Sequence, residues 1–484
     1  MTELKELLVK FNDQVTNLQN DETEVVEDTI EKINSTINEC SLQVSILTSV
    51  PFPTHDTLLS IKQLLLYSGD LVQEIDYDAL LEFLNNLIQL TTFDDILETF
   101  TVEDLQMALK SPIISLVQSA CLIVSLSYPK GILASTIIFD ILLDLYFKDD
   151  TEIIVINAID KIWYNLSSDK LVRDNILKNN LKLLQLIKQN LNPLPTVRLL
   201  NLLAILLEHI DSVNEFNSSI FLVSEEDAWK IIEKDILLFL HVIKYYTEWF
   251  IYVNNPKQFW LLDFLKPVIL SLGQIFDQKD KQPQIVSFAK MYLFKFFQKV
   301  SYLSDLTIFK ELDEKYLHVS IENDFIEEFL SFINPEYLYE SHRPIIEDLV
   351  ILSPSKLPII RNLVSDENTF NVIKTELTSV SILSLPYPEQ MVLLQKMTQY
   401  EHSVKYLILS LPKVMSNLID NADNHIIEPE TVQLRTEAID NLLKFSSEEL
   451  NVWYQPLKDE FVKIRHNVDP NKTVQASVAS AFIQ

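Results

Sequence analysis

The stretch "NLSSDKLVRDNIL" (Asn165–Leu177) joins the end of one apolar helical pattern to the start of the next through a Ser-Ser-Asp corner. The same arrangement returns in "NLVSDENTFNVI" (Asn362–Ile373), with a one-residue slip after the aspartate, and more loosely in "NLLKFSSEELNVW" (Asn441–Trp453). In each stretch a helix that ends in Asn-Leu meets a Ser or Asp residue suited to cap the next helix. A recurring corner of this kind is typical of a helical-hairpin repeat.

Glycine is scarce in this chain of 484 residues. It contains only Gly69, Gly131 and Gly273, whereas average usage would give roughly 34 glycines. Tight hairpins and nucleotide-binding loops need glycine to reach positive φ, so sheet-based folds are disfavoured. Apolar residues recur at helical spacing along nearly the whole chain. The sequence therefore predicts an all-α fold, with a compact irregular α domain as the alternative to a repeat array.

The predicted architecture is an arched, HEAT/armadillo-like α-solenoid. Such repeats span about 40–47 residues, so the chain could hold roughly ten to twelve helical hairpins. Thr101, Ser224 and Ser446 each precede a helical pattern, with an acidic residue three positions later, as in a capping box. No Pro/Ser-rich linker interrupts the pattern. We therefore predict one solenoid over residues 1–465 and a frayed tail over 466–484.

The charge balance restricts the partners. The formal net charge is −30, which disfavours direct contact with nucleic acid or an anionic membrane. Residues 1–100 alone hold 19 acidic residues against four lysines. These acidic residues form either a solvated face or a surface that binds a basic partner. Cys40 and Cys121 are the only cysteines. Two isolated thiols and the lack of an apolar leader in the first residues favour a reducing compartment, so we expect a cytoplasmic protein.

Patterns of catalytic or metal-binding residues are missing from the sequence. The three scattered glycines cannot form a phosphate-binding loop or a nucleophile elbow. No two histidines lie three to five residues apart, as zinc ligands often do. We predict a chain that is no enzyme and holds neither cofactor nor metal. No tryptophan is followed four residues later by asparagine, which excludes armadillo import adaptors that clamp basic peptides. The acidic HEAT-type import receptors stay open, although they are typically much longer.

A partner-binding surface is predicted from two helical patterns, over residues 195–210 and 235–253. Each is apolar except for one narrow polar stripe, as expected for the inner helix of a solenoid repeat. The residues of the two stripes that we predict to bind a partner are Arg198, Asn201, Glu208, His241, Lys244, Tyr245, Glu248 and Tyr252. The alternative is that they are satisfied polar groups on ordinary buried helices.

Several sequence blocks resemble one known family in content and order. They are "FDDILETFTVEDLQMALKS" (Phe93–Ser111), "PKGILASTIIFDILLDLYF" (Pro129–Phe147), "LPYPEQM" (Leu385–Met391) with the segments that follow it, and "VWYQPLKDEF" (Val452–Phe461). They are similar to the yeast HEAT-repeat chaperones that assemble the base of the proteasome regulatory particle. That family also has an older name as a mismatch-repair protein. The resemblance is thin before Phe93.

The resemblance implies a function. Its members hold the C-terminal domain of one AAA+ ATPase subunit on a concave surface, gather an assembly module and delay docking on the core particle. It thus implies such a partner for this chain, with no direct binding of nucleic acid or membrane and a monomer before binding. No motif ties the family's contact residues to positions here. The alternative is a general HEAT adaptor for transport or another complex, including an indirect role in mismatch repair.

Overall fold

The recurring corners begin helices as predicted. The computed structural model describes residues 2–20, 27–49, 52–67, 74–420 and 428–466. Asp169 and Asp366 are N-cap residues whose side chains accept hydrogen bonds from backbone amides of α10 and α22. Thr101 and Ser446 form capping boxes with Asp104 and Glu449. Ser224 caps α14 by accepting from the Asp227 amide, so the predicted helix starts are confirmed.

The described residues fall into two compact units, Met1–Phe264 and Leu265–Gln484. The helices of the first unit are α1 (Thr2–Asn20), α2 (Glu27–Ser45), α3 (His55–Leu65), α4 (Tyr77–Ile88), α5 (Phe93–Thr99), α6 (Val102–Leu109), α7 (Ile114–Ser125), α8 (Ile138–Phe147), α9 (Ile153–Leu166), α10 (Lys170–Asp174), α11 (Leu181–Asn190), α12 (Pro193–Leu207), α13 (Ser218–Phe221), α14 (Glu225–Lys234) and α15 (Ile236–Val253). The helix α16 (Leu261–Asp277) contains the boundary between the units.

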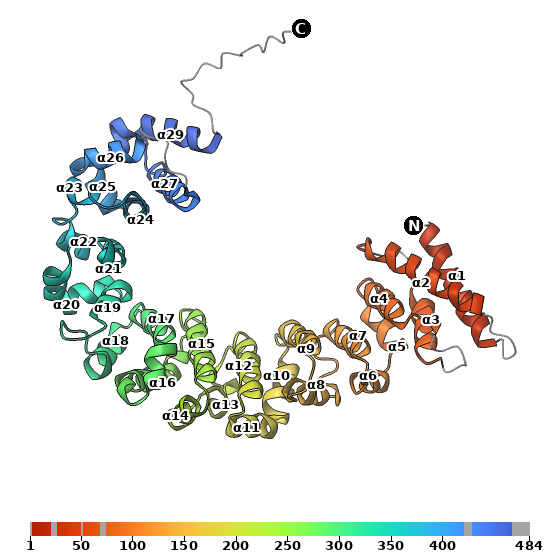
Figure 1. Cartoon of the computed structure of the whole chain (residues 1–484). Coiled ribbons are helices and arrows are strands. Elements are labelled where there is room, and N and C mark those ends of the chain that lie inside the picture. The colour runs from red at the N-terminus through yellow and green to blue at the C-terminus, as the bar shows by residue number, and fades with distance from the viewer. Residues whose placement is uncertain (1, 21–26, 50–51, 68–73, 421–427, 467–484) are drawn as a thin grey trace, which may run out of the picture. The chain divides into compact units, whose positions relative to one another are not determined.

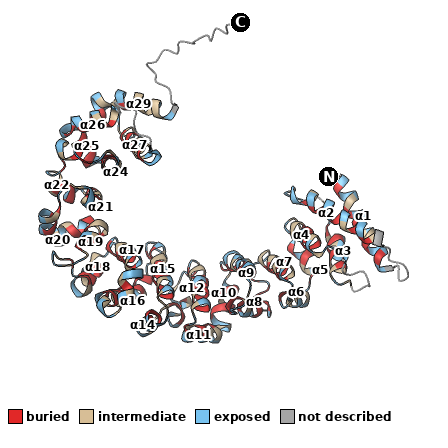
Figure 2. Cartoon of the chain, viewed as in Figure 1, coloured by how far each residue is buried: buried red, intermediate tan, exposed pale blue. Residues whose placement is uncertain are grey.

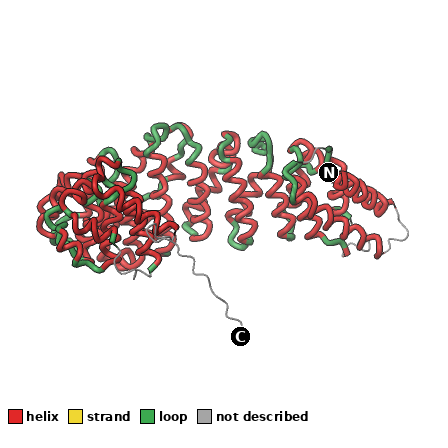
Figure 3. The backbone as a smooth tube through the Cα atoms, turned by 90° about the horizontal axis from the view of Figure 1, so that it is seen from above, coloured by secondary structure: helices red, strands yellow, loops and turns green. Residues whose placement is uncertain are grey.

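The second unit continues with α17 (Lys290–Ser301), α18 (Leu306–Leu312), α19 (Ile326–Phe332), α20 (Pro335–Leu349), α21 (Leu357–Leu363), α22 (Glu367–Ile373), α23 (Ser379–Leu383), α24 (Tyr387–Met397), α25 (Glu401–Ser410), α26 (Pro412–Ile419), α27 (Pro429–Leu442), α28 (Ser447–Leu450) and α29 (Tyr454–His466). Single π-helical turns lie at η2 (Asn175–Asn179), η5 (Ile285–Ala289) and η6 (Asp313–Leu317). Short 3₁₀ turns lie at η3 (Val213–Glu215), η4 (Lys279–Lys281), η7 (Pro354–Lys356) and η8 (Asn451–Trp453). The described chain contains no β-strand, which confirms the all-α prediction (Figure 3).

Each unit consists of two rows of helices. In the first unit, α2, α4, α7, α9, α12 and α15 pack side by side in one row, and α6, α8, α11 and α14 belong to the other (Figure 1). The row helices from α4 to α15 start at Tyr77, Ile114, Ile153, Pro193 and Ile236, so successive starts are 37, 39, 40 and 43 residues apart. These spacings are close to the roughly 40–47 residues of HEAT-like hairpins. Helices of both rows contain buried residues, which are red in Figure 2.

The second unit repeats this plan with shorter helices. Its row consists of α17, α19, α21, α24 and α27, which pack in that order, while α20, α22, α25 and α26 lie in the other row. With six row helices in the first unit and five in the second, the described residues agree with the predicted ten to twelve repeats. The continuity of one solenoid over 1–465 stays a prediction. The predicted frayed tail lies outside the described residues, except for His466, which ends α29.

Long polar side chains take over the role that glycine has at many helix ends. The last carbonyl groups of a helix lack intrahelical partners, and a glycine C-cap often satisfies them. Here Gln258 donates to the carbonyls of Leu207 and Ile210, at 2.9 and 3.0 Å, where α12 ends. Asn362 donates to the carbonyls of Leu330 and Ile333 where α19 ends, at 2.9 and 2.7 Å. A residue from the following repeat thus completes the helix before it and ties the two together.

Candidate functional site: the face of α12 and α15

The candidate site is the polar face of two adjacent row helices. Pro193 in the first turn of α12 suits the fixed φ of that position. The helix α15 is capped by Asp235, whose carboxylate accepts from the amides of Leu237 and Leu238. The two helices pack side by side in the first unit. We define the α12–α15 face by its accessible polar residues, Asn201, Glu208, His241, Lys244, Glu248 and Tyr252.

Six of the eight predicted residues reach the surface of this face. Asn201, Glu208, His241 and Lys244 are exposed, while Glu248 and Tyr252 are half-buried. The Lys244 ammonium and the Glu248 carboxylate form an ion pair at 4.0 Å across one turn of α15. Solvent reaches both side chains, which are 65% and 44% exposed, so this pair adds only about 0.3–0.5 kcal/mol to stability. Whether these six residues bind a partner stays a prediction.

Arg198 of α12 was predicted to lie on the exposed polar stripe, but the structure buries it. It is only 6% exposed, and its guanidinium donates two 2.8 Å hydrogen bonds to the carbonyls of Tyr146 and Lys148, where α8 ends. The neighbouring hydroxyl of Tyr146 donates to the Asp160 carboxylate at 2.6 Å. The expectation that Arg198 is exposed was therefore wrong. A helical wheel shows which side of α12 is polar, but it cannot show that α8 ends against that side.

Tyr245 of α15 was likewise predicted to lie on the exposed stripe, and it is buried too. Its side chain is 3% exposed, and its hydroxyl donates to the carbonyl of Phe221, the last residue of α13, at 3.2 Å. Burial raises the pKa of Tyr245 well above its ordinary value. Its ring packs edge-on against Trp249. Tyr245 thus belongs to the core, because α13 covers the part of α15 on which it lies.

Electrostatics connect the end of α12 with α15. Burial raises the pKa of Tyr252, and the negative charges of Glu208 and Glu248 raise it further. Glu208 is the C-cap residue of α12, so the fold brings its carboxylate near a tyrosine 44 positions later. The resulting surface combines two carboxylates, one ammonium and a half-buried aromatic ring. It can hold a polar partner surface, and it has no arrangement suited to bond cleavage.

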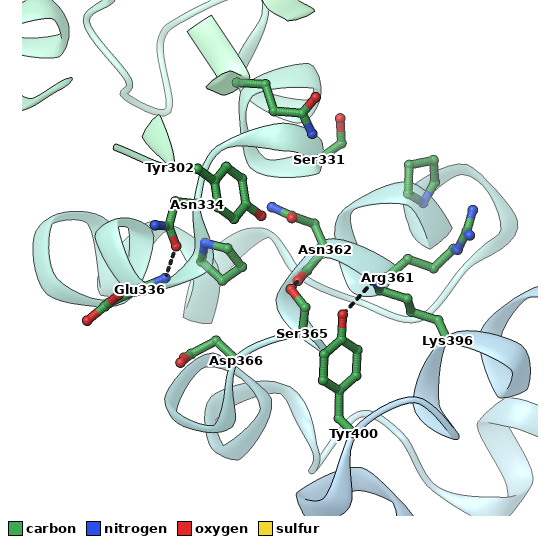
Figure 4. Close-up of a pocket in the computed structure, with 13 residues that line it drawn as sticks. Tyr302, Ser331, Asn334, Glu336, Arg361, Asn362, Ser365, Asp366, Lys396 and Tyr400 are labelled. Carbon is green, nitrogen blue, oxygen red and sulfur yellow. Dashed lines mark hydrogen bonds between the residues drawn. The ribbon is translucent and has the colours of Figure 1, made fainter. Parts of the chain in front are cut away.

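A pocket in the second unit was not predicted. It has a volume of about 630 Å³ and lies where four successive repeats turn, at the end of α17 and at the corners α19–α20, α21–α22 and α24–α25 (Figure 4). We call it the corner pocket. It is lined by Gln298, Tyr302, Ser331, Asn334, Pro335, Glu336, Pro358, Arg361, Asn362, Ser365, Asp366, Lys396 and Tyr400.

The lining of the corner pocket includes two tyrosines, two cations and two carboxylates. Lys396 donates to the Tyr400 hydroxyl at 2.8 Å and lies 5.0 Å from the centre of its ring. The Nε atom of Arg361 is buried and has no hydrogen-bond partner in the structure. Burial raises the pKa of Tyr302, and the nearby Tyr400 contributes. The repeated sequence corner includes Asn362 and Asp366, but only the stacking of four corners creates the pocket.

Comparison with known proteins identifies the family. The model described as "DNA mismatch repair protein HSM3, N terminal domain" matches residues 12–250. Its counterpart for the C terminal domain matches residues 258–483. The chain belongs to the HSM3 family. The change from one model to the other falls close to the boundary between the two compact units.

Curated HSM3 relatives align with most of the chain. The protein of Eremothecium gossypii is 38% identical over 437 residues, which cover 89% of this chain and 91% of the relative. The Candida glabrata protein is 38% identical over 429 residues, covering 87% and 89%. The Saccharomyces cerevisiae protein is 35% identical over 447 residues, covering 91% and 93%. All three are named "DNA mismatch repair protein HSM3", which confirms the resemblance to the family with the mismatch-repair name.

Reactive groups are sparse in this HSM3 family member. Among the described residues, no three His, Cys, Asp or Glu side chains lie together as a metal site requires. Cys40 and Cys121 are buried free thiols, and burial raises the pKa of each to about 12. A thiol that stays protonated is a poor nucleophile. The all-α fold and the HSM3 family names point to a protein without enzymatic activity.

The helix α15 is long and apolar enough to cross a membrane by length and composition, and it is the one described helix that meets this test. Half of its 18 residues are buried inside the structure. Its neighbours α12 and α14 pack against it. A core helix of a helical stack passes the same test, so this feature is weak evidence for a membrane span.

Proposed function

We propose that this HSM3 family member is a non-catalytic chaperone for assembly of the proteasome regulatory-particle base. It binds the C-terminal domain of one AAA+ ATPase subunit, in the company of that subunit's assembly module. The bound chaperone delays docking of the subunit on the core particle. Family membership and the ordered sequence blocks support this proposal. The two-row helical stack supports it as well, because such stacks present extended surfaces to folded partners.

The α12–α15 face is the proposed contact surface. The observation that carries this assignment is the grouping of Glu208, Glu248 and Tyr252 beside exposed Lys244 on two packed helices. Aromatic residues surrounded by mixed charge are typical of binding hot spots. The two helices that carry this face, α12 and α15, are held in place by Trp249 and by other fully buried side chains. A rigid base of this kind limits the entropy lost when a partner binds.

Calorimetry with the isolated C-terminal domain of each base ATPase tests the proposal. We expect one domain to bind with micromolar or tighter affinity. The double variant Lys244→Ala/Tyr252→Ala should weaken that binding by about tenfold or more. The control Lys182→Ala/Leu186→Ala changes exposed residues of α11, in the other row, and should leave it unchanged. Binding of none of the domains would refute the chaperone assignment, and equal affinities of the two variants would refute only the assigned face.

The second candidate function is that of a helical-repeat adaptor for another complex, including an indirect role in mismatch repair. The printed name of the HSM3 relatives favours it. A net charge of −30 argues that such a role would involve a protein partner and no contact with the DNA phosphates. Filter binding with duplex DNA at low salt tests this point, and tight binding would contradict it. In both cases we expect a cytoplasmic protein that is monomeric before binding.

A further inference from the structure

One segment of this acidic chain is basic and apolar at the same time. Residues 279–299 contain five lysines and a single acidic residue, Asp280, whereas the whole chain has 69 acidic against 39 basic residues. The segment includes η5 and the row helix α17 of the second unit. Its exposed side chains were not part of the predicted binding surface.

The exposed side of this segment combines large apolar side chains with lysines. Phe288 is 56% exposed, Met291 68%, Tyr292 44% and Tyr302 51%, and Lys295 and Lys299 are exposed as well. From Met291 to Tyr302 these residues follow the i, i+3, i+4 spacing of one helix face. We name Phe288, Met291, Tyr292, Lys295, Lys299 and Tyr302 the α17 stripe. Neither Lys295 nor Lys299 has an ion-pair partner within the described part of the chain, whereas Lys290 pairs with Glu328 at 3.3 Å.

The α17 stripe leads into the corner pocket. Tyr302 belongs to the stripe and also lines the pocket, together with Gln298 of α17. Arg361 and Lys396 add two cations there, and neither has a carboxylate partner among the described residues (Figure 4). The second unit thus contains a surface that begins with exposed apolar side chains and ends in a pocket with two cations, neither of which is paired with a carboxylate.

The base under the stripe is rigid. Phe294, on the buried side of α17, packs against Phe329 and Phe332 of α19, with ring centres 5.3 and 5.1 Å apart. Phe276 of α16 packs against Phe294 at 5.5 Å. Side chains held on packed helices bind more precisely than side chains on loops. The exposed methionine and aromatic residues are therefore not explained by a loosely packed core.

We propose that the α17 stripe and the corner pocket bind an acidic segment of a partner protein that also carries apolar side chains. The apolar side chains contact Phe288, Met291 and Tyr292, and the carboxylates pair with Lys295 and Lys299. Further acidic side chains reach Arg361 and Lys396 in the pocket. Charge complementarity identifies this chemistry, because these cations lack carboxylate partners among the described residues.

A protein segment fits this surface better than a nucleic acid. The exposed apolar side chains of Phe288 and Met291 find apolar counterparts on a protein segment and none on a phosphate backbone. Met291 is a residue typical of adaptable protein-binding surfaces. The inference is independent of the proposed function, since it concerns another unit and another surface than the α12–α15 face.

The test uses the full chain and a fluorescent synthetic peptide of repeated Glu-Glu-Leu-Phe, followed by fluorescence anisotropy. We expect binding that weakens about tenfold in Lys295→Glu/Lys299→Glu. It should stay unchanged in Lys413→Glu/Lys444→Glu, which reverses an exposed lysine of α26 and an exposed lysine in the turn after α27. Equal affinities of the two variants would overturn the proposal. So would stronger binding of a Lys-Lys-Leu-Phe peptide or of duplex DNA.

A second measurement locates the peptide without relying on charge reversal. Met291→Cys can be labelled selectively with a polarity-sensitive dye, because Cys40 and Cys121 are buried. The acidic peptide should shift the emission of this dye, and it should not shift a dye on Leu409→Cys, an exposed position of α25. The reverse pattern would place the peptide elsewhere and refute the proposed surface. The α12–α15 variant Lys244→Ala/Tyr252→Ala should bind the acidic peptide like the wild type, which separates this test from that of the proposed function.

Discussion

The α12–α15 face and the α17 stripe are both exposed sides of row helices, but the polar residues predicted or found on them differ in whether the protein itself pairs them. Of the eight residues predicted for the first, Arg198 and Tyr245 are instead buried inside the protein, where they satisfy carbonyl groups at helix ends. On the second, Lys295 and Lys299 have no partner in the described structure. The difference teaches that a polar stripe on a helix indicates a binding surface only when the surrounding helices leave its groups unpaired.

The largest effect is expected at Arg198. Arg198→Ala leaves the carbonyls of Tyr146 and Lys148 without their donor, and should lower the free energy of unfolding by about 3 kcal/mol. Asn201→Ala changes an exposed residue of the same helix and should alter it by less than about 0.5 kcal/mol. Urea unfolding followed by circular dichroism measures both. If the two variants are equally stable, Arg198 is not a structural residue and the contrast between the two surfaces fails.

A smaller loss is expected at Tyr245. Tyr245→Phe keeps the ring but removes the hydrogen bond to the carbonyl of Phe221, which should cost about 1 kcal/mol. The matched change Tyr252→Phe affects a half-buried residue and should cost less. The same unfolding experiment compares them. A greater loss for Tyr252→Phe would mean that Tyr252 is the structural tyrosine of α15.

Substitutions on the α17 stripe should weaken binding of the acidic peptide without lowering the stability of the protein. Met291→Ala/Tyr292→Ala removes two exposed side chains, so the free energy of unfolding should change by less than about 0.5 kcal/mol. Binding of the acidic peptide should nevertheless weaken. Leu293→Ala, at the fully buried position that follows them in sequence, should instead cost about 2–5 kcal/mol. A large loss of stability in the double variant would show that the stripe is part of the core.

The finest test concerns the charge around Tyr252. Because Glu208 raises the pKa of Tyr252, Glu208→Gln should lower it toward its ordinary value. The raised pKa favours the neutral phenol in the folded state, so it reduces stability only above the ordinary tyrosine pKa, and the variant should lose less stability there. Nuclear magnetic resonance of tyrosine labelled at Cζ follows the titration. Glu233→Gln, an exposed residue of α14, is the control, and an equal shift there would contradict the proximity of Glu208 and Tyr252.

Much of the fold was predictable, because it depends on local chemistry. Three glycines and a helical apolar period exclude sheet-based folds, and the caps at Thr101, Ser224 and Ser446 form as their sequences indicate. The repeated Ser/Asp corner marks where helices start at Asp169 and Asp366. These features involve residues at most a few positions apart, so the sequence displays them directly.

The candidate sites were predictable only in part. The sequence by itself determined that the chain is a helical repeat and that α12 and α15 carry polar stripes, because periodicity and capping are local. Only the tertiary structure decided that Arg198 and Tyr245 are buried, because each is covered by a helix end from another part of the sequence. It also decided that four distant corners enclose a pocket beside α17. The physical reason is that burial and pairing depend on neighbours in space, which a helix period does not specify.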